Sequence, residues 1–218
     1  MTNKDTDGSF DADGEEKNEL SWTETNWEEY LAEHEVAVRD YLRHYEQASG
    51  APDRIDEVAR QMGWEIELPE EAEASAALEA SEENFPGEWE PYTLHRNPVH
   101  IATKALYTSL LVNWDRVAVH PDRIAPALGL TVQASLYRGR ESALQAVQAL
   151  DLGDYSLAVC FFKRALREVN EVLARLSESE LSDATLLSRY REFALPRLFD
   201  LREIWLRVMN ECRQADGE

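Results

Sequence analysis

The fold class of this chain is decided by residues 143–176, ALQAVQALDLGDYSLAVCFFKRALREVNEVLARL. In the second half of this stretch, apolar residues recur every three or four positions, at Ala158, Phe162, Ala165, Val169, Val172 and Leu176. This spacing places them on one face of an α-helix with 3.6 residues per turn. The pair Gly153-Asp154 predicts a tight turn between this helix and the one before it.

The same helical spacing extends on both sides of this stretch. One helix is expected from Pro98 to about Ala118, since Asn97 and Pro98 form an N-cap followed by proline at the first helical position. Its apolar residues fall on more than one side, so we expect more than one side to be buried. A short helical turn near residues 123–128 leads to Gly129, and a helix is expected from Thr131 to about Leu152. The last helix is expected over residues 183–212, with a kink at Pro196.

Residues 21–64 predict two further helices. The first is expected to begin near Asn26 as its N-cap, and its apolar seam is Trp27, Leu31, His34, Val38, Tyr41 and Tyr45. Residues 49–52, Ser-Gly-Ala-Pro, end that helix. A short second helix follows and ends at Gly63.

These elements predict an all-α protein, with a four-helix up-down bundle preceded by an N-terminal helical hairpin and acidic flexible segments. We expect four parts: a disordered acidic N-terminus (1–20), an N-terminal helical arm (21–64), an acidic linker (65–90) and a helical bundle domain (91–218). The arm either packs across the bundle or projects from it.

The 218-residue composition excludes several protein classes. Hydrophobic residues make up 44%, enough for a core. The two cysteines, Cys160 and Cys212, lie in apolar helical patterns and are expected to be core residues, which argues against a disulfide framework. The N-terminus has no apolar core of a signal peptide, and no stretch is long and apolar enough to cross a membrane. We therefore expect a cytoplasmic protein that does not associate with membranes.

The negative charge is concentrated in the N-terminal part of the chain. Residues 1–90 contain 27 Asp and Glu against 6 Lys and Arg, while residues 91–218 contain 16 of each, so the whole net charge of −21 comes from the first 90 residues. Nucleic acid is thus an improbable partner, because phosphate contacts need concentrated positive charge. A local basic face in residues 91–218 is left open.

The string RDYLRH, residues 39–44, resembles the Arg-polar-x3-His motif of HEPN-domain ribonucleases, and residues 143–176 resemble the central helices of that family. The resemblance implies that Arg39 and His44 act on a phosphate, with histidine as the group that transfers a proton. The family carries this motif on its final helix. Here it lies on the first helix, and the last helix contains no histidine.

Two other stretches resemble known helical motifs. Residues 153–165 resemble the second helix of a tetratricopeptide repeat, although no second repeat follows. Residues 124–144 resemble a helix-turn-helix with Gly129 in the turn, but the second helix carries an apolar seam that favours a core helix.

No catalytic or metal-binding signature is found. The five histidines include no pair at i, i+4 spacing, and no Glu-x-x-His sequence occurs. The Asp-rich units at residues 5–8 and 11–14 lack the acidic residue that a calcium loop requires after its glycine. His34 is expected to be a hydrogen-bonded interior residue, and His95 and His100 are expected to lie at a helix start, where capping accounts for them. We therefore expect a non-catalytic protein without cofactor or metal.

The acidic N-terminal part is the best candidate for a binding function. The amphipathic segment at residues 19–31 contains Trp22, Trp27, Tyr30 and Leu31 among carboxylates. Large aromatic residues often anchor interfaces, and the negative charge would attract a basic protein partner. The alternative is that Trp22 and Trp27 only fasten the arm to its own bundle. The sequence thus predicts a protein-interaction or structural bundle with an acidic partner-binding arm; the alternatives left open are a HEPN-like RNA-binding or ribonuclease bundle and a helical homodimer.

Overall fold

The computed structural model describes residues 22–64, 94–120, 122, 124–178 and 184–215. Among these residues no strand occurs and nearly all are helical, so the predicted all-α class is confirmed for the described part of the chain. The helices are α1 (Glu24–Gln47), α2 (Arg54–Gln61), the 3-10 helix η1 (Leu94–Arg96), α4 (Pro98–Ala118), α5 (Pro126–Asp151), α6 (Tyr155–Glu178) and α7 (Ala184–Ala215). The segments predicted to be a disordered N-terminus and an acidic linker lie outside the described residues.

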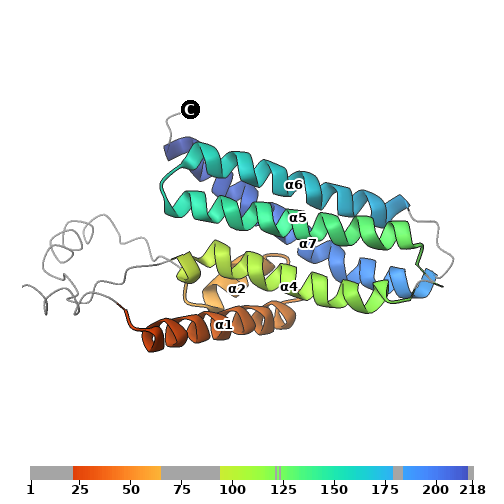
Figure 1. The fold of residues 1–218 in the computed structure, drawn as a ribbon, viewed down its shortest axis with the longest axis horizontal. Helices are drawn as coiled ribbons and strands as arrows, with labels where there is room; N and C mark the ends of the chain where they lie inside the picture. The colour runs from red at the N-terminus through yellow and green to blue at the C-terminus, as the bar shows by residue number, and fades with distance from the viewer. Residues whose placement is uncertain (1–21, 65–93, 121, 123, 179–183, 216–218) are drawn as a thin grey trace, which may run out of the picture. The chain divides into compact units, whose positions relative to one another are not determined.

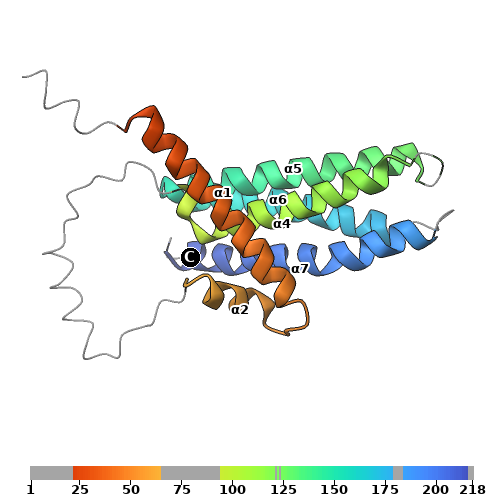
Figure 2. The same cartoon turned by 90° about the horizontal axis from the view of Figure 1, so that it is seen from below.

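The described residues fall into two compact units, 22–33 and 34–215. In the second unit, α4 packs against α5 and α7, and α6 packs against α5 and α7. Figures 1 and 2 show these four long helices side by side. The part of α1 from His34 onward and α2 belong to this unit, and hydrogen bonds join them to α7.

The predicted apolar seam of α6 lies in the core, together with residues of α4 and α7. All six seam residues of α6 are buried, and Phe162 among them has no exposed surface. Trp205 of α7 stacks on Phe162 and on Tyr107 of α4, with ring centroids 6.1 and 6.0 Å apart, and donates a hydrogen bond from its indole nitrogen to Thr103. Buried aromatic rings of this size contribute much of the apolar area that a core removes from water.

The turn between α5 and α6 forms at the predicted pair. Gly153 has a φ of +75°, and the amide groups of Gly153 and Asp154 donate to the carbonyl oxygens of Leu150 and Ala149. This is the Schellman pattern, which favours glycine at the left-handed position. The Asp154 carboxylate then accepts from the amide of Leu157 and caps the start of α6.

The start of α4 is also as predicted. The Asn97 side chain accepts hydrogen bonds from the amides of Val99 and His100, and Pro98 is the first helical residue. The prediction that histidines cap this helix is wrong for His100, because Asn97 supplies the cap and the His100 side chain is buried.

The predicted break near Gly129 is wrong. α5 begins at Pro126 and continues through Gly129, so the turn that the helix-turn-helix resemblance requires is absent from this described helix. Pro126 has a favourable φ for the first turn, and the indole of Trp114 donates to the Gly129 carbonyl. The proline start and this hydrogen bond outweigh the low helix propensity of one glycine.

Three further expectations need correction. Leu31 lies on the predicted seam of α1 but is 43% exposed, and Tyr30 is the buried residue instead. The helix from Pro98 is expected to be buried on more than one side, but Val112 on α4 is 44% exposed. Cys160, expected in the core, is an exposed free thiol, whereas Cys212 is buried as expected. Periodicity places a residue on a helix face but does not tell which part of that face a neighbouring helix covers.

Candidate functional site

The first turn of α1 is held by a capping box and a hydrophobic staple. The backbone amide of Thr23 donates to the Asn26 side chain at 3.0 Å, and the amide of Asn26 donates to the Thr23 hydroxyl at 3.3 Å. Trp22 precedes the cap and packs on Trp27, with ring centroids 4.8 Å apart. A hydrophobic staple joins these two positions. Because Thr23 exchanges these hydrogen bonds with Asn26, the N-cap is Thr23 and not the predicted Asn26.

The aromatic residues at the start of α1 form one cluster. Tyr30 meets Trp22 and Trp27 edge-on, at centroid distances of 5.3 and 6.0 Å. Trp22 and Trp27 are half-buried, Tyr30 is buried, and Leu31 is 43% exposed. All four predicted partner-binding residues thus lie within two turns of one helix end. We call these three aromatic residues, together with Leu31, the α1 aromatic cluster.

Four carboxylates lie in the same helical segment as the α1 aromatic cluster. Residues 22–33 contain Glu24, Glu28, Glu29 and Glu33 and no basic residue, and all four side chains are exposed. Carboxylates near a helix N-terminus are stabilised by the helix dipole. The helix start therefore presents a half-exposed apolar surface within a local negative field.

Arg39 and His44 do not form a common site on α1. Arg39 is exposed and His44 is half-buried. A separation of five residues turns the helix by about 140°, so the two side chains leave α1 in different directions. Asp40 of the same motif pairs with Arg43 at 3.0 Å.

Three histidines that are distant in sequence meet in the second unit. His34 of α1, His95 of η1 and His100 of α4 have ring centroids 4.7 to 5.2 Å apart. His34 and His100 are buried, and the Lys104 ammonium lies 3.3 Å from Nδ1 of His34. The expectation that His34 is a hydrogen-bonded interior residue is confirmed. Sequence reasoning did not find the cluster, because nothing in the local pattern reports that α1 lies against the start of α4.

Burial keeps these imidazoles neutral. It lowers the pKa of His34 to about 4, with further lowering by the Lys104 charge and the other two histidines. Burial likewise lowers the pKa of His100 to about 4, and His95 and Lys104 add to the effect. The pKa of His95 is lowered by burial and by Lys104. Within the described ranges, no group of three His, Cys, Asp or Glu side chains is arranged to hold a metal ion, and the Asp-rich units at residues 5–8 and 11–14 lie outside those ranges.

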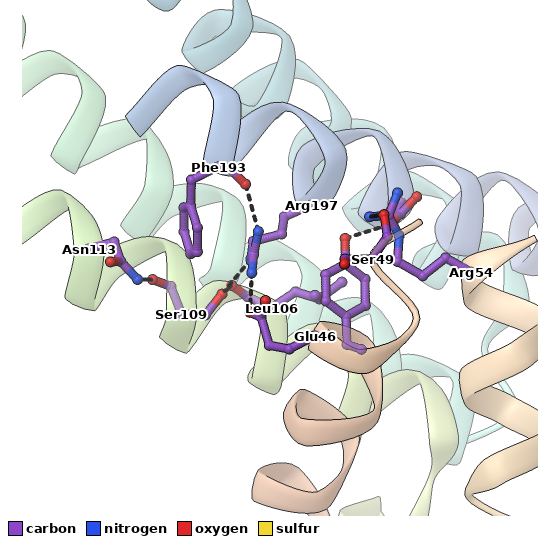
Figure 3. Close-up of polar contacts among 10 residues, drawn as sticks. Glu46, Ser49, Arg54, Leu106, Ser109, Asn113, Phe193 and Arg197 are labelled. Carbon is purple, nitrogen blue, oxygen red and sulfur yellow. Dashed lines mark hydrogen bonds and ion pairs between the residues drawn. The ribbon is translucent and has the colours of Figure 1, made fainter. Parts of the chain in front are cut away.

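A buried polar network fastens α1 to α4 and α7 (Figure 3). The Arg197 guanidinium is almost completely buried and donates to the hydroxyl of Ser109, to the backbone carbonyl of Phe193 and to the carboxylate of Glu46. It also lies 3.5 Å from the centre of the Phe193 ring, a cation–π contact. Because the protein itself supplies these hydrogen-bond partners, we interpret Arg197 as a structural residue that positions the helices.

A second set of contacts extends this network to α2. Asp200 of α7 accepts a hydrogen bond from Tyr45 at 2.5 Å and pairs with Arg54 at 3.0 Å. Farther along α7, Arg207 pairs with Asp56 of α2. An open cleft of about 380 Å³ lies beside this pair, with mainly apolar walls that include Tyr41, Trp64 and Val99.

No protein-family model, curated protein or solved structure matches this chain. No helix in the described part of the chain has both the length and the apolar character needed to cross a membrane.

Proposed function

We propose that the protein is a non-catalytic interaction module that binds a basic, amphipathic segment of another protein through the α1 aromatic cluster. The observation that carries this proposal is the arrangement of the cluster: half-exposed indole rings and an exposed leucine on a capped helix start, in a segment with four exposed carboxylates. Aromatic rings of this type anchor interfaces, and the capped helix start reduces the entropy lost on binding.

The charge distribution supports a basic partner. All of the net charge of −21 arises from residues 1–90, which include α1. Such a field attracts positively charged partners and raises their association rate. A lysine- or arginine-rich segment with apolar side chains at helical spacing has the chemistry that this surface accepts.

We further propose that α4 to α7 act as the scaffold for this site, as a four-helix up-down bundle with α1 and α2 as a helical hairpin before it. The pairwise packing of the four long helices and the buried Arg197 network support this arrangement. We place the protein in the cytoplasm, which agrees with two free cysteines.

The apolar half of the site is tested with a matched pair of variants. Leu31→Asp places a charge in the proposed site, and Leu206→Asp places the same charge at an equally exposed position of α7, since these leucines are 43% and 44% exposed. Proteins retained from native lysate are identified by mass spectrometry. We expect a specific protein that the wild-type chain and Leu206→Asp retain and that Leu31→Asp loses; equal retention by all three contradicts the proposal.

The alternative function is a HEPN-like bundle that binds or cleaves RNA. Its support is the sequence resemblance of residues 39–44 and 143–176; against it, the side chains of Arg39 and His44 leave α1 in different directions. RNA that co-purifies with the wild-type chain, and a cleavage activity that His44→Ala removes, would favour this function over protein binding.

A further inference from the structure

We propose that His34, His95 and His100, with Lys104, form an acid-sensitive latch that holds α1 against the start of α4 and opens when its imidazoles take up protons. The latch is a device of the second unit and does not depend on the binding role proposed above. Its elements are α1, η1 and α4, so the cluster exists only while these elements are packed together.

The hydrogen bond at His34 requires a neutral ring. The Lys104 ammonium carries only donors, so Nδ1 of His34 must accept, and the proton of the neutral ring then lies on Nε2. In an imidazolium both ring nitrogens are donors. Protonation of His34 therefore removes this hydrogen bond and places two positive charges side by side.

In the described part of the chain, the charges that lower the pKa values of the three histidines come from Lys104 and from the histidines themselves. From α4, Lys104 acts on all three histidines, and from α5 the Arg140 charge acts on Lys104. From α1, the Glu35 carboxylate acts on Lys104 in the opposite sense and raises its pKa. Nε2 of His34 and Nδ1 of His100 are buried with no hydrogen-bond partner in the described residues. A protonated ring would therefore gain no hydrogen bond to a described carboxylate at either atom.

Acid therefore favours the open state. In the packed state the pKa of His34 and of His100 is about 4, whereas exposed histidine has the ordinary value of 6.5. The open state binds more protons between these values, so the stability of the contact is complete above about pH 6.5 and is lost as the pH falls toward 4. At pH 5 the opening equilibrium shifts by roughly 30-fold for each of these histidines.

Opening is expected to be local. The C-terminal half of α1 is held separately by Glu46 on Arg197 and by Tyr45 on Asp200. Loss of the latch therefore frees the part of α1 around His34, directly after the α1 aromatic cluster, while the rest of the second unit stays packed.

The latch is tested on the full chain with His34→Gln/His100→Gln and the control His44→Gln/His120→Gln, which removes two histidines outside the cluster. Amide hydrogen exchange, corrected for its intrinsic pH dependence, is compared at pH 7 and pH 5. Between pH 7 and pH 5, we expect the amides around residues 34–38 and 100–105 to lose protection from exchange in the wild type and in the control. This loss should be at least 30-fold larger than the loss for the amides of α6. His34→Gln/His100→Gln should show no such extra loss. The same loss in this variant as in the wild type overturns the proposal.

A second measurement keeps the test valid if the variant does not fold. The imidazole C–H signals of His34 and His100 are titrated by NMR in the wild-type chain. Both rings should show a pKa well below the ordinary histidine value. Their titration should occur over the same pH range as the change in amide exchange around residue 34. Ordinary titration of both rings, with no change in exchange, overturns the proposal.

Discussion

At the scale of single residues, buried polar side chains specify how the helices meet. Arg197 is the clearest case, because its guanidinium contacts Glu46 of α1, Ser109 of α4 and Phe193 of its own helix. A buried guanidinium left without such partners costs several kcal/mol, so only an arrangement that supplies all of them is stable. The contacts of Arg197 with Ser109 and Glu46 join residues 88 and 151 positions apart and could not be read from the sequence.

A close contact between α4 and α5 gives a direct test at this scale. A Cβ atom at Gly139 would lie 2.5 Å from the hydroxyl oxygen of Tyr107, and this hydroxyl is buried with no hydrogen-bond partner among the described residues. We expect Gly139→Ala to lower the free energy of unfolding by about 1–3 kcal/mol, because the added methyl group overpacks this contact.

The matched variant is Tyr107→Phe, which removes the hydroxyl. Alone it should be neutral or stabilise by about 1 kcal/mol, since it eliminates an unsatisfied buried group. In Gly139→Ala/Tyr107→Phe most of the loss should be recovered, and urea unfolding of the four proteins gives the coupling energy. Additive effects would show that the two residues do not approach each other as described.

At the scale of elements, the sequence was informative where local chemistry decides the outcome. The α6 seam, the Asn97-Pro98 start and the turn at Gly153 all depend on neighbouring residues, and all are as predicted. The α1 cap was misplaced although its signal was present, since Trp22-Thr23 and Asn26-Trp27 have the spacing of a cap and staple. The low helix propensity of Gly129 predicts a turn there, but α5 continues through this residue.

Two glycines provide a prediction at the element scale. Gly153 ends α5 at a positive φ, which costs an L-residue about 1 kcal/mol or more. Gly129 lies inside α5 and has nothing within 4 Å of an added Cβ. We expect Gly153→Ala to lower the free energy of unfolding by at least about 1 kcal/mol and Gly129→Ala to raise it by up to about 1 kcal/mol. Urea unfolding measures both, and a loss of stability in Gly129→Ala would mean that α5 is broken at this glycine.

At the scale of the whole molecule, charge and packing give different information. Composition locates the negative charge in residues 1–90, and this follows from counting alone. Composition does not predict that residues 34–64 pack with the later helices in one unit. The structure shows this, because Tyr41, Tyr45 and Val58 lie in the core. A fragment that starts at residue 91 would therefore lack part of its core, so the binding role is best examined in the full chain.

The central claim is that the start of α1 is a binding site for a basic protein partner. Its most direct test compares proteins retained from native lysate by the wild type, by Glu28→Lys/Glu29→Lys and by the control Asp115→Lys/Glu141→Lys. Both variants reverse two exposed carboxylates and so change the net charge equally, but only the first lies beside the α1 aromatic cluster.

We expect the wild type and the control to retain the same basic protein, and Glu28→Lys/Glu29→Lys to lose most of it. Retention should also fall when the salt is raised from about 0.1 M to about 1 M, because screening shortens the Debye length from about 10 Å to about 3 Å. Equal retention by all three chains, or equal loss from both variants, would contradict the assignment of partner binding to the start of α1.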